Sequence, residues 1–228
     1  MDHPSAALLV LQQNAYWTSA IANLAELFAV HGETARGRAS DYAEVYAGRR
    51  GSMVIDVVAS RQRKYIGRVL KIVDRWEAAS PDTTLLTLAE SGIDARTYGL
   101  QDAEATTIRA VATNLSGFGS TMGLNDNEAC KTWADQCGGV EHAPSLDPVV
   151  GSVKGIGPAL FAYMRMRSGS SAIKVNIRVR KSLRSLGFRV PDSDHATMVV
   201  ARVAGEAIGI DLLMLDQLLW HANGSTDT

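Results

Sequence analysis

The chain has 228 residues, 46% of them apolar, and its 23 Lys and Arg residues nearly balance its 24 Asp and Glu residues. It can bury one good core or two small ones, and no apolar run approaches the roughly 18–20 residues of a membrane span. The first residues lack the basic stretch of a signal peptide, and two cysteines are too few for a disulfide scaffold. We therefore expect a reduced, cytoplasmic protein with no membrane association.

Apolar residues recur at helical spacing along the N-terminal part of the chain. Residues 6–31 predict one or two amphipathic helices that end near Gly32, followed by a polar connector with a short helix around Tyr42 to Tyr46. Residues 53–59 have the composition of a strand. The 3.6-residue period that continues to Trp76 instead favours helices on both sides of a bend at residues 60–63.

The rest of the chain is also predicted to be helical. Helices are expected over 81–92, 102–115 and 127–137, with a glycine-rich loop over 116–123 and another loop over 138–148. A helix capped by Asp194 should run to Ile208, and a last helix should cover 211–223, with a disordered tail after it. The sequence therefore predicts an all-α protein.

A glycine-rich turn at Lys154-Gly155-Ile156-Gly157 is predicted to connect two helices. Glycine can adopt positive φ and lets another backbone come close. Pro158 suits the first position of the next helix, because its missing N–H would have no partner there. The free N–H groups at that helix start carry the positive end of its dipole, and this predicts a phosphate site.

The segment around this turn is locally basic. No Asp or Glu lies between Pro148 and Pro191. The cations in this segment are Lys154, Arg165, Arg167, Lys174, Arg178, Arg180, Lys181, Arg184 and Arg189. Binding to a phosphate backbone needs such a cluster. The alternative interpretation is a turn between two core helices with solvated charges around it.

The turn, together with the run from Val175-Asn176-Ile177-Arg178 to Leu186-Gly187, resembles the helix-hairpin-helix (HhH-GPD) DNA glycosylases. This superfamily includes endonuclease III and the adenine and 8-oxoguanine glycosylases. Its motifs read roughly L-P-G-V-G-x-K-T-A and V-D-T-H-V-x-R-V-x-x-R-L-G. Asn176 stands at the position of the family's catalytic Asp, and Ala159 stands at the position of the lyase Lys.

Ser60-Arg61-Gln62 resembles a second landmark of the same enzymes, a Ser-x-Gln loop whose Gln helps to fill the gap left by an extruded base. The resemblance makes Gln62 the candidate gap filler. A solvated polar helix start is the alternative interpretation. The candidate DNA contacts are Arg61, Arg63, Lys64, Lys154, Gly155, Gly157, Arg178, Arg180 and Lys181.

The resemblance also implies an architecture and a partner. We expect two helical lobes, residues 51–167 with the hairpin and residues 1–50 plus 168–228, and duplex DNA over the cleft between them. The protein should be a nucleoid-associated monomer. It should have no metal or iron–sulfur cofactor, and a monovalent cation at the hairpin is the one candidate ion.

Asn176 decides what chemistry to expect. An amide cannot ionise, so it cannot stabilise the positive charge that develops on the sugar as the base leaves. Ala159 cannot form a Schiff base, which excludes the usual lyase reaction. Asn is also among the best N-caps, so Asn176 could simply begin a helix.

Three explanations of Asn176 stay open: loss of hydrolysis in a DNA binder, a carboxylate supplied from elsewhere, or a deliberate Asp-to-Asn substitution. The candidate replacement carboxylates are Asp56, Asp74, Asp211 and Asp216. The preferred function is a DNA-binding protein that recognises an altered or flipped base, with excision left open. The alternatives are a monofunctional DNA N-glycosylase without lyase activity, and a helical module that binds RNA or a protein partner.

Overall fold

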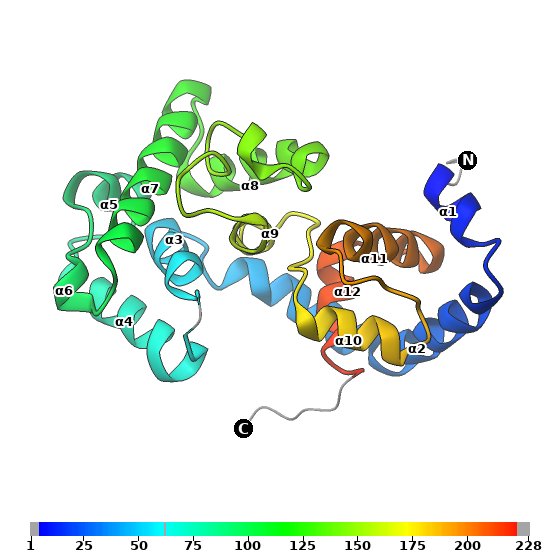
Figure 1. Cartoon of the computed structure of the whole chain (residues 1–228). Helices are drawn as coiled ribbons and strands as arrows, with labels where there is room; N and C mark the ends of the chain where they lie inside the picture. Colours follow the sequence, from blue (N-terminus) through cyan, green and yellow to red (C-terminus); the bar gives the residue numbers. More distant parts are fainter. Residues whose placement is uncertain (1–4, 62, 223–228) are drawn as a thin grey trace. The chain divides into compact units, whose positions relative to one another are not determined.

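The computed structural model describes residues 5–61 and 63–222, and the regular secondary structure in this part of the chain is helical (Figure 1). The all-α class is confirmed. The chain divides into two compact units, residues 1–42 with 171–228 (unit 1) and residues 43–170 (unit 2). The expected lobes had their boundaries at 50/51 and 167/168. Gln62 and the tail from residue 223 lie outside the described residues.

Unit 1 is built from both ends of the chain. It contains α1 (Ala6–Leu11), most of α2 (Ala15–Glu44), α10 (Ile177–Ser185), α11 (Asp194–Ile208) and α12 (Leu212–Leu219). Trp17 and Leu24 of α2 are buried with Leu183 and Leu215, and the Trp17 ring meets Phe188 edge-on at 5.2 Å between centroids. Trp17 is therefore a core residue.

Unit 2 is organised around α3 (Arg50–Ala59), every residue of which is buried. Helices α4 (Leu70–Ala79), α5 (Leu85–Ser91), α7 (Asp102–Met122), α8 (Asp126–Gln136) and α9 (Pro158–Arg167) pack against it. A π-helix, η1 (Tyr65–Val69), runs into α4, and α6 (Ala95–Tyr98) is a single turn. A helix buried on all sides is apolar all round, which explains the strand-like composition of residues 53–59.

Two predictions about helix ends are wrong, the end near Gly32 and the glycine-rich loop over 116–123. Helix α2 continues through Gly32 to Glu44, and α7 continues past Gly119 to Met122. A Cβ on Gly32 would lie 2.7 Å from the Phe28 ring, and one on Gly119 would lie 3.0 Å from Ala129 of α8. These glycines make room for a neighbour, and this packing outweighs their cost of about 1 kcal/mol in a helix.

The helix expected before the glycine turn is also absent. Residues 148–152 form turns, which follow two short 3₁₀ helices, η2 (Cys137–Val140) and η3 (Pro144–Leu146). The buried carboxylate of Asp147 accepts the N–H groups of Val150 and Gly151 at 2.8 and 2.7 Å, and the Trp133 indole N–H at 3.1 Å. The side chain thus takes the N–H donors that a regular helix would have satisfied.

Ser193, rather than Asp194, is the N-cap of α11. Cys130 and Cys137 are buried free thiols, and burial raises the pKa of each to about 12. In residues 5–61 and 63–222, no helix has the length and hydropathy to cross a bilayer, and no three His, Cys, Asp or Glu side chains gather as metal ligands would.

Candidate nucleic-acid interface

The two glycines of the predicted hairpin have different roles. Gly155 has φ of +99°, and a Cβ there would lie 2.5 Å from Oγ1 of Thr107, so the position requires glycine. The same Thr107 oxygen lies 2.8 Å from the Lys154 carbonyl oxygen and holds the turn against α7. Gly157 has φ of −102° and is the N-cap of α9, and a Cβ there would meet nothing within 4 Å.

The corner formed by Lys154 to Ala159 is open to solvent. Lys154, Pro158 and Ala159 are exposed, and Gly157 is half-buried. Within the described residues, the N–H groups of Gly157 and Ala159 donate to no acceptor, as expected at a helix start. The corner therefore has two main-chain donors without an acceptor in the described part of the chain and an exposed lysine three residues before Gly157.

Arg61 joins the turn after α3 to this corner. Its Nη2 donates to the carbonyl oxygen of Gly155, 94 residues further along the chain. Two motifs that are separate in the sequence thus form one surface. The carbonyls of Lys154 and Gly155 are engaged by Thr107 and Arg61, and a guanidinium lies beside them. Each of these two carbonyls thus already accepts one hydrogen bond, and the monovalent cation expected at the hairpin stays a prediction.

Arg63 is held by an acidic partner. Its Nη1 and Nη2 lie 2.5 and 2.6 Å from the two carboxylate oxygens of Glu104 on α7, and the side chains are 14% and 6% exposed. Burial alone would raise the pKa of Glu104, but hydrogen bonds from Arg63 and from the Gln101 N–H keep it below its ordinary value. Glu104 largely neutralises the charge of Arg63. The main role of Arg63 is therefore to hold the turn after α3 against α7.

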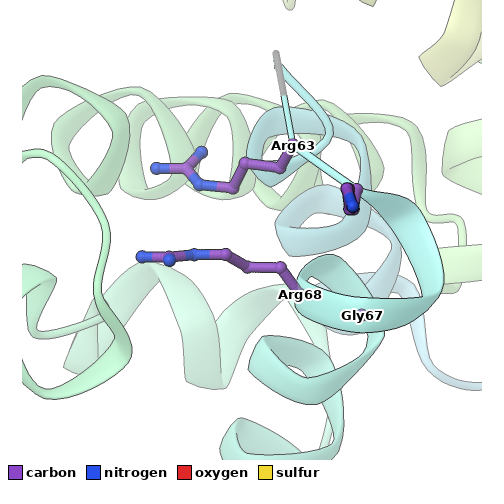
Figure 2. A pocket seen from close by; sticks show the side chains of 4 residues that line it. Arg63, Gly67 and Arg68 are labelled. Carbon is purple, nitrogen blue, oxygen red and sulfur yellow. The ribbon is translucent and has the colours of Figure 1, made fainter.

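Beyond this pair lies a hollow of about 360 Å³ lined by Arg63, Lys64, Gly67 and Arg68 (Figure 2). Arg68 was missing from the predicted contacts. Lys64 is the extended N-cap residue of η1 and Arg68 lies within this π-helix, so the spacing of the two residues in the sequence could not have identified Arg68.

The second motif lies in unit 1. Asn176 is exposed and is the N-cap of α10, where its Oδ1 accepts the Val179 N–H at 2.9 Å. The guanidinium of Arg178 lies 4.0 Å from the centroid of the Trp220 ring, and Trp220 is 47% exposed. Lys181 is exposed. Asn176 therefore has the N-cap role that asparagine suits.

The acid-free segment is not a continuous cationic surface. Arg165 and Arg167 are buried in unit 2, where Arg165 bonds to Glu141 and to the Ala134 carbonyl. Arg180 pairs with Asp192 and Asp194, which follow the segment directly. Counting charge along the sequence therefore overestimated the cations available to a phosphate backbone.

Arg167 belongs to a buried polar cluster with Asp56. The Asp56 carboxylate lies 3.3 Å from Arg167 and accepts hydrogen bonds from the hydroxyls of Tyr65 and Tyr163, each at 3.2 Å. The guanidinium also lies 5.3 to 6.0 Å from the ring centroids of Tyr46, Tyr65 and Tyr163. Burial raises the pKa of Asp56, against the opposing effect of Arg167 and the hydroxyls. This carboxylate is fully engaged in joining α3 to α9.

The other candidate carboxylates lie in different settings. Asp74 is exposed on α4, and Asp211 is the N-cap of α12, where it accepts the Met214 N–H. Asp216 is buried, and burial raises its pKa to about 7 although the Lys174 N–H and charge lower it. In the described part of the chain, then, both buried candidates already have protein partners.

Comparison of the chain with protein-family models, with curated proteins and with solved structures gave no match. The assignment of function therefore depends on the motifs and on the geometry described above.

Proposed function

We propose that this protein binds duplex DNA as a member of the helix-hairpin-helix glycosylase superfamily and recognises an altered or extruded base. The observation that carries the proposal is the open corner at Gly157. Two of its main-chain N–H groups have no acceptor in the described residues, the exposed Lys154 lies three residues earlier, and Arg61 donates to the Gly155 carbonyl. Donors at a helix start and adjacent cations are the elements of a phosphate site.

The geometry best supports a protein that recognises the base without using Asn176 to excise it. Asn176 cannot stabilise a cationic transition state, and its oxygen already caps α10. Asp56 and Asp216 are buried with partners, so a displaced catalytic carboxylate has less support. Binding, rather than base release, is the activity we expect of this chain.

Gly157→Leu tests the proposal. The substitution fills open space in front of α9, so we expect the free energy of unfolding to fall by less than about 1 kcal/mol, the scale of an N-cap change. It should block the approach of a phosphate and weaken duplex binding about ten- to a hundredfold, because hydrogen bonds to a charged group contribute about 1.5–3 kcal/mol. Fluorescence anisotropy with a labelled duplex at fixed salt measures the change.

Gly139→Leu is the matched control, because a Cβ at Gly139 in η2 also meets nothing within 4 Å. Equal affinities for the wild type, Gly157→Leu and Gly139→Leu would remove the corner from the interface. A single-stranded RNA of the same length serves as the competing ligand. Tighter binding to this RNA than to the duplex would support the alternative RNA-binding module instead.

A further inference from the structure

We propose that the hollow lined by Arg63, Lys64, Gly67 and Arg68 is a second phosphate-binding site, separate from the corner at Gly157. The inference deepens the proposed function, because the occupant would be a phosphate of the bound DNA. The hollow and the corner both belong to unit 2, and the turn that carries Arg61 connects them. One nucleic acid could therefore occupy both sites.

The lining of the hollow is cationic and partly fixed. Figure 2 shows the side chains of Arg63 and Arg68 extending in the same direction, one from the turn and one from η1. Glu104 holds Arg63 through two hydrogen bonds, so this wall is preorganised.

The free charge of the hollow comes from Lys64 and Arg68. Both are exposed, and neither pairs with an acidic side chain in residues 5–61 and 63–222. Arg68 makes one long hydrogen bond, 3.4 Å from Nη2 to the Gly99 carbonyl, which leaves other N–H groups of its fork unused. Because Glu104 is neutralised by Arg63, an anion entering the hollow meets a net positive charge.

Gly67 leaves the hollow open. A Cβ at this position would have a single neighbour within 4 Å, the Lys64 Cβ at 3.9 Å, so glycine is not required by packing. Its φ is not in the left-handed region either. Gly67 also lies within the π-helix η1, a rare conformation that is frequently found at functional sites. A glycine that neither the backbone nor the core requires is consistent with access for a ligand.

Phosphate is the anion that best fits this set of groups. An arginine fork can donate two parallel hydrogen bonds to phosphate oxygens, and a lysine adds a compact charge. The phosphate could be a diester of the continuous backbone or the terminal monoester at a strand break. The two sources share one chemistry, so they are separated by the substrate used in the test.

The first test is the salt dependence of binding to an intact duplex, measured for Lys64→Gln and Arg68→Gln. Loss of one phosphate contact should reduce the slope of log K against log salt by about 0.9. Arg75→Gln is the matched control, because Arg75 on α4 also donates to a main-chain carbonyl, that of Thr97 in α6, and lies outside the hollow. Slopes for the hollow variants equal to those of the wild type or of Arg75→Gln would exclude a backbone diester, and unchanged affinity for the nicked duplexes described next would then overturn the proposal.

A nicked duplex with a 5′-phosphate or a 5′-hydroxyl at the break identifies the source. A reduced slope on the intact duplex assigns a backbone diester. A loss of affinity confined to the 5′-phosphorylated nick assigns a terminal monoester, and either result supports the site. Gly67→Leu provides a second variant: leucine favours a helix more than glycine, so the melting temperature should stay equal or rise while affinity falls. A lower melting temperature with unchanged affinity would show a structural role instead.

A titration with pyrophosphate separates this inference from the proposed function. We expect the amide signal of Gly67 to shift in the wild-type protein and to stay unchanged in the Lys64→Gln/Arg68→Gln variant. Such a shift in a protein that fails to bind duplex DNA would support the hollow and contradict the proposed function. No shift at Gly67 in the wild-type protein would overturn the hollow whatever the DNA result.

Discussion

Asn176 is the residue at which the resemblance and the geometry can be tested together. Its Oδ1 caps α10, and aspartate is an equally good N-cap, so Asn176→Asp should leave the free energy of unfolding almost unchanged. The variant adds the anion that the resembled enzymes carry at this position. We expect it to release a base from at least one duplex of a panel of damaged and mismatched substrates, measured as strand cleavage after alkali treatment.

The unmodified protein, assayed on the same panel, is the control for this prediction. Base release by the variant alone would show that only the carboxylate is missing. If the folded variant binds DNA and releases no base from any substrate, the surroundings of Asn176 have lost the geometry for excision, and the expectation fails.

The raised pKa of Asp216 predicts a specific pH dependence of the free energy of unfolding. Its pKa is about 7 in the folded protein because of burial, compared with about 3.9 in an unfolded chain. The folded state therefore retains a proton that the unfolded state releases. The contribution of Asp216 to the free energy of unfolding falls between about pH 4 and pH 7 and is constant above that range.

Asp216→Asn should remove this dependence, because the amide oxygen can still accept the Lys174 N–H and carries no charge. Urea unfolding at pH 4.5, 6 and 8 should show the variant gaining stability relative to the wild type as pH rises, by about 1.4 kcal/mol for each pH unit within the window. A difference independent of pH would show that the carboxyl of Asp216 titrates at its ordinary value.

At the scale of elements, the pair Asp56–Arg167 connects α3 to α9, the helix that begins at the glycine corner. The two side chains are 0% and 7% exposed, so removing one leaves an uncompensated buried charge. We expect Asp56→Asn and Arg167→Met each to lower the free energy of unfolding by about 3–5 kcal/mol. The double variant should lose less than the sum, as measured by urea unfolding of all four proteins. Additive losses would contradict a coupled pair.

Local signals in the sequence explain which elements could be predicted. The N-cap at Asn176, the helix start at Pro158 and the bend after α3 each depend on residues within one or two turns. Gly32 and Gly119 were misread because their role depends on Phe28 and Ala129 packing against them. A glycine looks the same in the sequence whether it ends a helix or admits a neighbour.

The candidate site shows the same difference between features that depend on nearby residues and features that depend on distant ones. The glycine corner is a local pattern, whereas the bond from Arg61 to the Gly155 carbonyl spans 94 residues and has no counterpart in a sequence window. The burial of Arg165 and Arg167 was missed because a charge count assumes solvent, while Glu141 and Asp56 come from other elements. The hollow depends on Arg68, which lies outside both the glycine turn and the Ser-Arg-Gln loop.

At the scale of the whole molecule, unit 2 is continuous in sequence and carries both proposed phosphate sites. Its buried residues include Ile55, Ile108 and the edge-on pair Trp133–Phe161, all from within residues 43–170. We expect a 43–170 fragment to be helical by circular dichroism, to unfold cooperatively on heating and to bind duplex DNA.

The same fragment with Gly157→Leu is the control, and its affinity should be about ten- to a hundredfold lower, as in the full chain. A fragment that is folded and does not bind would place the interface outside unit 2. A fragment without a cooperative transition would show that residues 43–170 do not form an independent folding unit.

The discontinuity of unit 1 has a consequence for biosynthesis. Trp17 and Leu24 leave the ribosome early, but their partners Leu183 and Leu215 follow the 128 residues from 43 to 170. At about 5–20 residues per second, this delay lasts roughly 6–26 s. During that time the apolar stripe of α2 is an exposed nascent segment available to chaperones, while the intervening unit can already fold. Efficient production of this chain in a cell should therefore depend on a holdase acting on its first forty residues.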